Sequence, residues 1–190
     1  VNWLNTSKGY QAAYNFVSAD INSNISTWGV GLYSGNNQFR HKDSFYFLPS
    51  ENEWYKAAYF NPTTQSYSDY ANGLDTPPIA VIDGTSSNTA RYGQSESLGP
   101  ADVSNAGGLS PSGTMGQNGN AWEWTESAWD GVNDNGSETR VVLGGNKNDP
   151  TYVLQAGYRS SMDTVGTFLD GVEGFRVAAL PEPSALSLLL

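Results

Sequence analysis

Residues 61–112 form a long part of the chain that has no hydrophobic period, and they limit the folds that the chain can adopt. This segment is rich in Pro, Gly, Ser, Asn and Asp, and its apolar residues recur neither every 3.6 residues nor alternately. These residue types favour turns and loops. A loop region of this length inside a compact domain is uncommon, and it is usually functional or specific to a family. We therefore expect ordered loops with only brief strands here.

The composition supports a loop-rich domain with an aromatic core. The chain of 190 residues is long enough for one domain, and it has 21 Gly, 11 Tyr, 7 Phe and 6 Trp with only 15% charged residues. That profile does not fit a helical bundle or a coiled coil. The net charge is −10, and the sequence has no basic stripe. A nucleic acid is therefore not expected as a partner, because an acidic surface repels phosphates.

One helix has a clear sequence signal. Ser50 and Glu53 have the spacing of a capping box, in which each side chain accepts a hydrogen bond from a backbone N–H of the other. Trp54, Ala57 and Ala58 then fall on one helical face. The pattern predicts a helix over about residues 51–60, which Asn61 and Pro62 end.

Short strands are predicted around this helix. Residues 44–48 are a brief apolar run, and Trp122 and Trp124 alternate with smaller or polar residues over 119–125. Residues 140–143 predict another strand that Gly144 and Gly145 end, and residues 158–160 and 174–178 complete the set. His41, next to Lys42 and Asp43, is interpreted as a solvated loop residue.

Four blocks in this order resemble a known family. They are Leu-Pro-Ser-Glu-Asn-Glu-Trp from Leu48, the segment 113–125 with Gly-Asn-Ala-Trp-Glu-Trp, the segment 141–146 with Gly-Gly, and the closing strands with Tyr-Arg and Gly-Phe-Arg. Together they are similar to the formylglycine-generating enzyme, or sulfatase-modifying factor, domain. The resemblance implies an α+β fold of the irregular C-type-lectin-like kind, with short strands, few helices and long ordered loops. We expect this domain over residues 1–179, without its N-terminal part, and a linker with an anchor segment over 180–190.

The sequence lacks the groups that the family uses for catalysis. In catalytic members, a cysteine pair after the Gly-Gly turn binds copper, and the related iron enzymes need several histidines. This chain has no Cys and one His, and the matching segment 146–157 offers amides, one acid and hydroxyls. Copper(I) needs soft sulfur ligands. We therefore expect no enzymatic activity and no copper.

Several residues of the resembling blocks are expected to have structural roles. Trp54, Trp122, Trp124 and Phe175 are expected in the core, because large aromatic side chains contribute most to burial. Arg159 and Arg176 are expected to hold loops through hydrogen bonds to carbonyl groups and carboxylates.

The resemblance also implies a structural calcium site. Its ligands would be the carbonyl groups of Gly119 and Ala121 and the side chain of Glu123. Position 116, which supplies a side-chain oxygen in the family, is Gly here, so that Asn118 or a water would replace it. Calcium prefers six to eight oxygen ligands, which such a set can provide. At a second family site Arg91 stands where an Asn ligand is expected, so calcium is not expected there.

The C-terminal residues resemble a sorting signal. Pro181, Glu182 and Pro183 precede a leucine-rich end, as at the beginning of a PEP-CTERM signal. That signal implies export by a bacterium, a transient membrane anchor, and release to the cell surface or the extracellular matrix. A spanning helix needs about 20 apolar residues, and only a few remain here. The alternative is a proline-rich linker with a short apolar tail.

The sequence therefore predicts an exported, non-catalytic, lectin-like module that binds an extracellular polysaccharide or an envelope protein. The site is expected in the segment that replaces the family's active-site cleft, with Tyr152 as a stacking residue. Its ligand-binding residues would be Asn146, Asn148, Asp149, Tyr152 and Gln155. The loop 65–72 is a second candidate. The alternatives are an adhesin-like structural or protein-interaction module, and a degenerate enzyme of unknown reaction.

Overall fold

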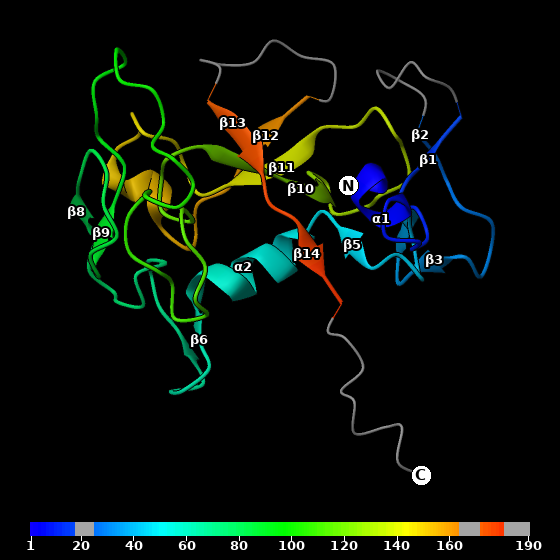
Figure 1. Ribbon diagram of the computed structural model, residues 1–190, viewed down its shortest axis with the longest axis horizontal. Helices are drawn as coiled ribbons and strands as arrows, with labels where there is room; N and C mark the ends of the chain where they lie inside the picture. Colours follow the sequence, from blue (N-terminus) through cyan, green and yellow to red (C-terminus); the bar gives the residue numbers. More distant parts are fainter. Residues whose placement is uncertain (18–24, 164–171, 181–190) are drawn as a thin grey trace. The chain divides into compact units, whose positions relative to one another are not determined.

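The structure is a computed structural model that describes residues 1–17, 25–163 and 172–180 (Figure 1). The chain divides into two compact units. One unit contains Pro49–Asp130 and Glu138–Arg176, and it carries the candidate site. The other contains Val1–Leu48, Gly131–Ser137 and the segment from Val177 onward.

The first of these units is built on a four-stranded sheet with the order β12-β11-β10-β13 (Figure 1). The strands are β10 (Trp122–Ala128), β11 (Arg140–Leu143), β12 (Ser160–Met162) and β13 (Glu173–Phe175). The pairs β10–β11 and β11–β12 are antiparallel, whereas β10–β13 is parallel. The strands predicted at 119–125 and 140–143 are thus confirmed, with the first shifted toward its C-terminus.

Helix α2 (Glu51–Tyr59) packs against one face of this sheet. Its N-terminus has the predicted capping box, because the Ser50 side chain accepts a hydrogen bond from the Glu53 N–H and Glu53 Oε2 accepts one from the Ser50 N–H at 2.7 Å. Trp54 and Ala58 are fully buried and pack with Val141 and Leu143. The predicted helix is confirmed in its type, its start and its buried face.

The segment 61–112 contains only two-residue strands, as expected. β6 (Phe60–Asn61) pairs with β7 (Ser66–Tyr67), and β8 (Ile79–Ala80) pairs in parallel with β9 (Thr89–Ala90). A short 3-10 helix, η1 (Thr151–Leu154), follows the sheet strand β11. Ordered loops make up the rest of this unit's described residues.

The second unit consists of short elements. They are α1 (Asn2–Thr6), β1 (Asn15–Phe16), β2 (Ile25–Ser26), β3 (Tyr33–Ser34), β4 (Asn37–His41), β5 (Tyr46–Phe47) and β14 (Ala178–Ala179). β1 pairs with β2, β3 with β4, and β5 with β14. Its core contains Ala13, Tyr14 and Phe47.

The interpretation of His41 as a solvated residue is wrong. His41 ends β4 and is only 7% exposed. Its ring meets the ring of Trp28 edge to face, with centroids 4.6 Å apart. The polar neighbours Lys42 and Asp43 in the sequence concealed this aromatic contact.

The C-terminal residues 181–190, which resemble a sorting signal, lie outside the described residues. Across the parts of the chain that the structure describes, no helix has the length and apolar character needed to cross a membrane. Export and membrane anchoring stay predictions.

Candidate functional site

The two faces of the sheet have different neighbours. Side chains alternate along a strand, so Glu123 points to the face that α2 covers, and Trp122 and Trp124 point to the other. Trp122 lies opposite Glu173 across the parallel pair of β10 and β13. The register thus places an indole ring and a carboxylate side by side on the face away from α2.

A cavity of about 210 Å³ opens on that face. We call it the Trp122 pocket. It is lined by one aromatic residue, two aliphatic or thioether residues, and five polar residues: Trp122, Val142, Met162, Asn146, Asp149, Ser160, Ser161 and Glu173. The two carboxylates are the only charged groups among these residues.

The turn after β11 brings two of the polar side chains into the pocket. Gly144 and Gly145 have φ angles of 94° and 72°, and residues other than Gly rarely adopt this backbone conformation. The turn then closes on itself, because the Asn146 N–H donates to Asp149 Oδ2 at 2.7 Å. The Asn148 N–H donates to Asn146 Oδ1 at 2.8 Å. Local hydrogen bonds therefore fix Asn146 and Asp149 before any ligand binds.

A row of three aromatic rings adjoins the pocket. The rings of Trp122 and Tyr158 have centroids 6.2 Å apart, and Tyr158 meets Tyr152 edge to face at 5.9 Å. Tyr152 is 58% exposed. Trp122 and Tyr158 pack against the buried Val153 and Leu154 of η1. The row therefore runs from the pocket to the surface on a well-packed base.

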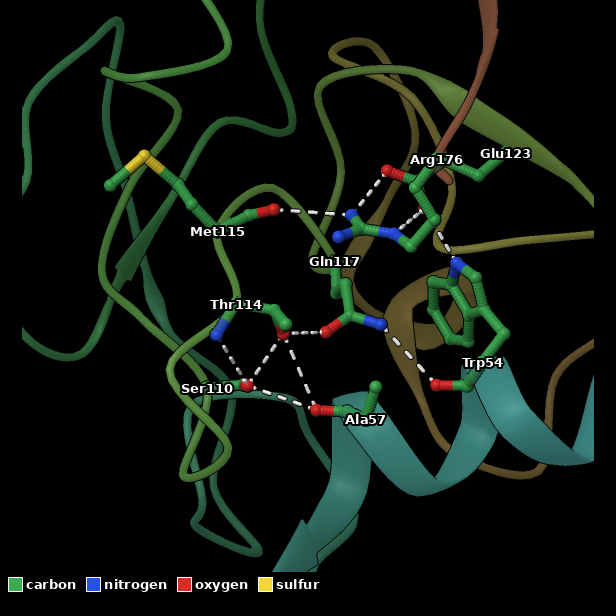
Figure 2. A network of polar contacts seen from close by, with 8 residues as sticks. All are labelled: Trp54, Ala57, Ser110, Thr114, Met115, Gln117, Glu123 and Arg176. Atoms are coloured by element: carbon green, nitrogen blue, oxygen red, sulfur yellow. Dashed lines mark hydrogen bonds and ion pairs between the residues drawn. The ribbon is translucent and has the colours of Figure 1, made fainter. Parts of the chain in front are cut away.

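A second cavity, of about 420 Å³, has a different lining. We call it the Arg176 pocket, and its side walls include the exposed Val103 and Phe175. The Arg176 guanidinium donates to both carboxylate oxygens of Glu123, and its Nη2 also donates to the Met115 carbonyl at 3.1 Å (Figure 2). The two charges in this pocket thus neutralise each other.

Helix α2 provides a further hydrogen-bond donor to the Glu123 carboxylate. The Trp54 indole N–H donates to Glu123 Oε2 at 2.5 Å (Figure 2). Trp54 itself is fully buried. The carboxylate therefore links the helix, the central strand β10 and the residue that follows β13.

The loop before β10 is hydrogen-bonded to helix α2. Gln117 is 2% exposed, and its amide donates to the Trp54 carbonyl at 3.3 Å while its oxygen accepts from Thr114 Oγ1 (Figure 2). Ser110 Oγ donates to the Ala57 carbonyl at 3.0 Å, and Thr114 Oγ1 contacts the same carbonyl. These contacts satisfy carbonyl groups of α2 and make the network a structural one.

The structure brings together only part of the predicted ligand site. Asn146 and Asp149 line the Trp122 pocket. Asn148 Oδ1 instead accepts from Lys147, and the Gln155 amide donates to the Tyr70 hydroxyl at 3.1 Å. Tyr152 is exposed at the end of the ring row and does not line the cavity.

Sequence reasoning missed the other half of the pocket. Trp122 was assigned to the core, and Ser160, Ser161 and Glu173 were not considered as ligand-binding residues. Alternation along β10 indicates that Trp122 and Trp124 share a face, but only the pairing with β13 shows that Glu173 joins it. Phe175, also expected in the core, is 61% exposed.

The residues predicted to bind calcium do not fit a calcium ion in their present arrangement. Both Glu123 oxygens accept N–H groups, and Asn118 Oδ1 accepts the Ala71 N–H at 3.2 Å. The Gly119 carbonyl accepts the Ala121 N–H at 2.9 Å. Calcium would have to displace these donors. Among the described residues, no three His, Cys, Asp or Glu side chains group as a metal site would require.

Arg91, at the position where the resemblance implies a second calcium ligand, is a buried cation. Arg91 is 3% exposed, and its guanidinium donates to the carbonyl groups of Ile82 and Gly99. The Arg91 guanidinium thus occupies these two carbonyl oxygens. The neighbouring Gly119 has no room for a side chain, because a Cβ there would lie 2.2 Å from the Arg91 carbonyl oxygen.

The segment that corresponds to the copper-binding cysteines does not fit copper either. The side chains of Asn146, Asp149 and Gln155 are engaged in hydrogen bonds, and the chain has no Cys. Hard oxygen and amide donors do not match the preference of copper(I) for sulfur.

Comparisons with known proteins agree on the fold. The chain is similar to the solved structures of Treponema denticola variable protein 1 and of CarF, with TM-scores of 0.62 and 0.60 and 18% identity to each. Both likenesses cover 95% of this chain, which spans 66% and 63% of the lengths of those two chains. A comparison with curated proteins finds no match. The α+β fold of the formylglycine-generating-enzyme type, with short strands and few helices, is thus confirmed.

A family model also matches almost the whole chain. It describes the sulfatase-modifying factor enzyme 1-like domain, and it matches residues 2–180. The motifs around Trp54, Trp122 and Arg176 lie within this range, and the structure joins them through Glu123. The chain therefore belongs to the family of sulfatase-modifying factor enzyme 1-like domains.

Proposed function

We propose that this chain is a non-catalytic module that binds a sugar unit of an extracellular polysaccharide in the Trp122 pocket. The observation that carries the proposal is the lining of that pocket, which combines one indole ring with polar residues. The cavity of about 210 Å³ is smaller than the roughly 300–1,000 Å³ of pockets for drug-sized ligands. A cavity of this size suits one sugar ring of a polysaccharide whose neighbouring sugar units lie outside the cavity.

The chemistry of the lining matches that of a sugar. A pyranose has C–H groups on its faces and hydroxyl groups around its edge. The Trp122 ring offers an apolar surface to such a face. The Ser160 hydroxyl and the Asn146 amide can both donate to and accept from the hydroxyl groups at this edge, and the Glu173 carboxylate can accept from them.

The composition of the chain supports a role without catalysis. With no Cys and one His, the chain cannot supply the cysteine pair or the histidine cluster of catalytic relatives. The one histidine, His41, packs against Trp28 in the other compact unit. The pocket's carboxylates are assigned to binding.

Export to the cell surface or the extracellular space is part of the proposal. It rests on the Pro-Glu-Pro motif at residues 181–183, which resembles a sorting signal. A polysaccharide ligand is consistent with that location, as is the acidic net charge of −10, which disfavours binding to nucleic acids.

A glycan array tests the proposal, followed by titration calorimetry on each oligosaccharide that binds. Trp122→Ala is expected to remove binding, whereas Trp3→Ala, the same change at a 78% exposed site in the other unit, should leave it intact. Because Trp122 is partly buried, Ser160→Ala provides a milder change in the pocket, expected to weaken binding severalfold. Binding to no glycan of a broad array would overturn the proposal and favour an adhesin-like protein-interaction module.

A further inference from the structure

Strand β13 lies at one edge of the four-stranded sheet, where its partner among the described strands is β10. The Trp122 N–H donates to the Val172 carbonyl group at 3.0 Å, and the register places Trp124 opposite Phe175. In a parallel pair, alternate residues of a strand turn their backbone groups toward the neighbouring strand. The N–H and C=O groups of Phe175 therefore point away from β10, and they make no hydrogen bond with the residues that the structure describes. An edge of this kind can pair with a further strand.

The Arg176 pocket adjoins this edge. Gly174, Phe175 and Arg176 all line its cavity of about 420 Å³. Gly174 lies opposite Glu123 across the pair of β10 and β13, and it has no side chain to fill the cavity. On a strand added to the edge, the residue that pairs with Gly174 has its side chain on the same face of the sheet as Glu123. The edge and the cavity can therefore receive one segment, which pairs with β13 and inserts a side chain.

The cavity offers mainly apolar contacts to a ligand. Val103, Ala106 and Met115 are among its lining residues, and Val103 is 82% exposed. The amide of Asn120 is already paired, because its Oδ1 accepts the Ala101 N–H at 2.7 Å and its Nδ2 donates to the Ala101 carbonyl group at 3.3 Å. A sugar would bury several hydroxyl groups here with few partners, which costs free energy. An apolar side chain suits this lining better than a sugar does.

Arg176 provides one polar group for a ligand. Its Nε and Nη2 donate to Glu123, and Nη2 also donates to the Met115 carbonyl group (Figure 2). The third nitrogen, Nη1, makes no hydrogen bond with the described residues. Because the Glu123 carboxylate already offsets the positive charge, a neutral acceptor such as a main-chain carbonyl group matches Nη1. The pocket thus combines an apolar cavity with a donor for a peptide carbonyl oxygen.

We propose that a partner protein adds a short extended segment to the open edge of β13 and inserts an apolar side chain into the Arg176 pocket. About three residues would pair, because β13 spans Glu173–Phe175. Strand addition of this kind gains affinity from main-chain hydrogen bonds and specificity from a side-chain pocket. Aromatic, Met and Arg residues are enriched in protein interfaces, and Phe175, Met115 and Arg176 line this cavity. It shares no lining residue with the Trp122 pocket, so the inference does not depend on sugar binding.

NMR titration of the isotope-labelled chain with a short neutral peptide tests the inference. The peptide is acetylated and amidated, and it has a central leucine between threonines. It is expected to shift the amide signals of Phe175 and Gly116 saturably. It should bind at least about 5-fold more tightly than the same peptide with a central serine, because burial of leucine is favourable. A third peptide, N-methylated along its backbone, keeps the side chains but lacks the donors for strand pairing, and it should bind at least about 5-fold more weakly.

Two valine variants provide a matched control. Val103→Asp should weaken binding of the leucine peptide at least about 5-fold, because it places a charge at the wall of an apolar cavity. Val30→Asp, the same change at a 96% exposed site in the other unit, should leave the affinity intact. Both valines are largely exposed, so neither change is expected to unfold the chain.

Several outcomes would overturn the inference. They are equal affinities for the leucine and serine peptides, undiminished binding of the N-methylated peptide, equal losses in the two variants, and no saturable shift at all. Shifts of Gly116 and Phe175 with a glucose oligomer but not with the peptide would overturn it as well, and would assign the cavity to a sugar. The proposed function is judged separately, by the effect of Trp122→Ala on glycan binding.

Discussion

Arg176 and Glu123 form a paired contact in which the guanidinium donates one hydrogen bond to each carboxylate oxygen. Their side chains are 22% and 12% exposed, so the pair is largely shielded from water. The same carboxylate accepts the indole N–H of the fully buried Trp54. The strand β10, the helix α2 and the end of β13 therefore depend on one ion pair.

Arg176→Met is expected to lower the free energy of unfolding by roughly 3 kcal/mol. The loss follows because a shielded carboxylate then keeps only one donor in place of three, and breaking a buried pair costs about 3–5 kcal/mol. Urea unfolding followed by tryptophan fluorescence measures it.

Arg159→Met is the matched control for this substitution. Arg159 pairs with Glu51 at 3.3 Å, but the two side chains are 39% and 29% exposed. An exposed pair contributes about 0–1 kcal/mol. Equal losses in the two variants would contradict a special role for the Arg176–Glu123 pair.

Calcium is expected to leave the melting temperature unchanged. The predicted calcium ligands Glu123 and Asn118 accept hydrogen bonds from protein donors, and Arg176 is the cation beside Glu123. A ligand that binds only the folded state would raise the melting temperature. Thermal unfolding in millimolar calcium and in chelator measures the difference. A rise of several degrees with calcium would show that the ion displaces the guanidinium, and would restore the site that the resemblance implies.

The sequence predicted those parts of the fold that depend on neighbours along the chain. The capping box of Ser50 and Glu53 and the apolar face of Trp54 and Ala58 specify α2 locally, so that the prediction of this helix is confirmed. The family motifs predicted the fold as a whole, because they are spread over most of the chain. His41 and Phe175 were assigned wrongly, since burial of a single side chain depends on packing partners distant in sequence.

The candidate site was predictable only in the part that one turn supplies. Asn146 and Asp149 lie in a single turn after Gly145, so their proximity follows from the sequence. Trp122 and Glu173 are neighbours through the parallel pairing of two strands. Nothing within either strand specifies that pairing, and an indole beside a carboxylate was therefore not foreseen.

Tyr59 is expected to make the protein less stable at high pH. Its side chain is 2% exposed, its hydroxyl donates to the Leu154 carbonyl at 3.3 Å, and burial raises its pKa well above the ordinary value of about 10. Below pH 10 the phenol is protonated in both states. Above pH 10 the phenol ionises in the unfolded state but stays protonated in the folded state. The contribution of Tyr59 to the free energy of unfolding therefore falls as the pH rises toward the folded-state pKa.

Urea titrations of the wild type and of Tyr59→Phe between about pH 8 and 11.5 measure this effect. The variant lacks the hydroxyl and should be less stable near neutral pH by about 1 kcal/mol, the usual contribution of one hydrogen bond. The difference should shrink or reverse at the alkaline end. A constant difference over the whole range would contradict the burial effect.

Tyr152→Ala is expected to weaken binding of oligosaccharides but not of a single sugar unit. Tyr152 is 58% exposed at the outer end of the ring row and does not line the cavity, so that it can stack only on a unit next to the bound one. A loss of roughly 3- to 10-fold corresponds to about 0.5–1.5 kcal/mol for one aromatic contact. Calorimetric titration with a monosaccharide and with its oligomers gives both affinities, and Tyr152→Phe, which keeps the ring, should bind nearly as the wild type does. If Tyr152→Ala weakens monosaccharide and oligomer equally, the ring acts through the shape of the pocket; if it weakens neither, the polymer leaves the pocket in another direction.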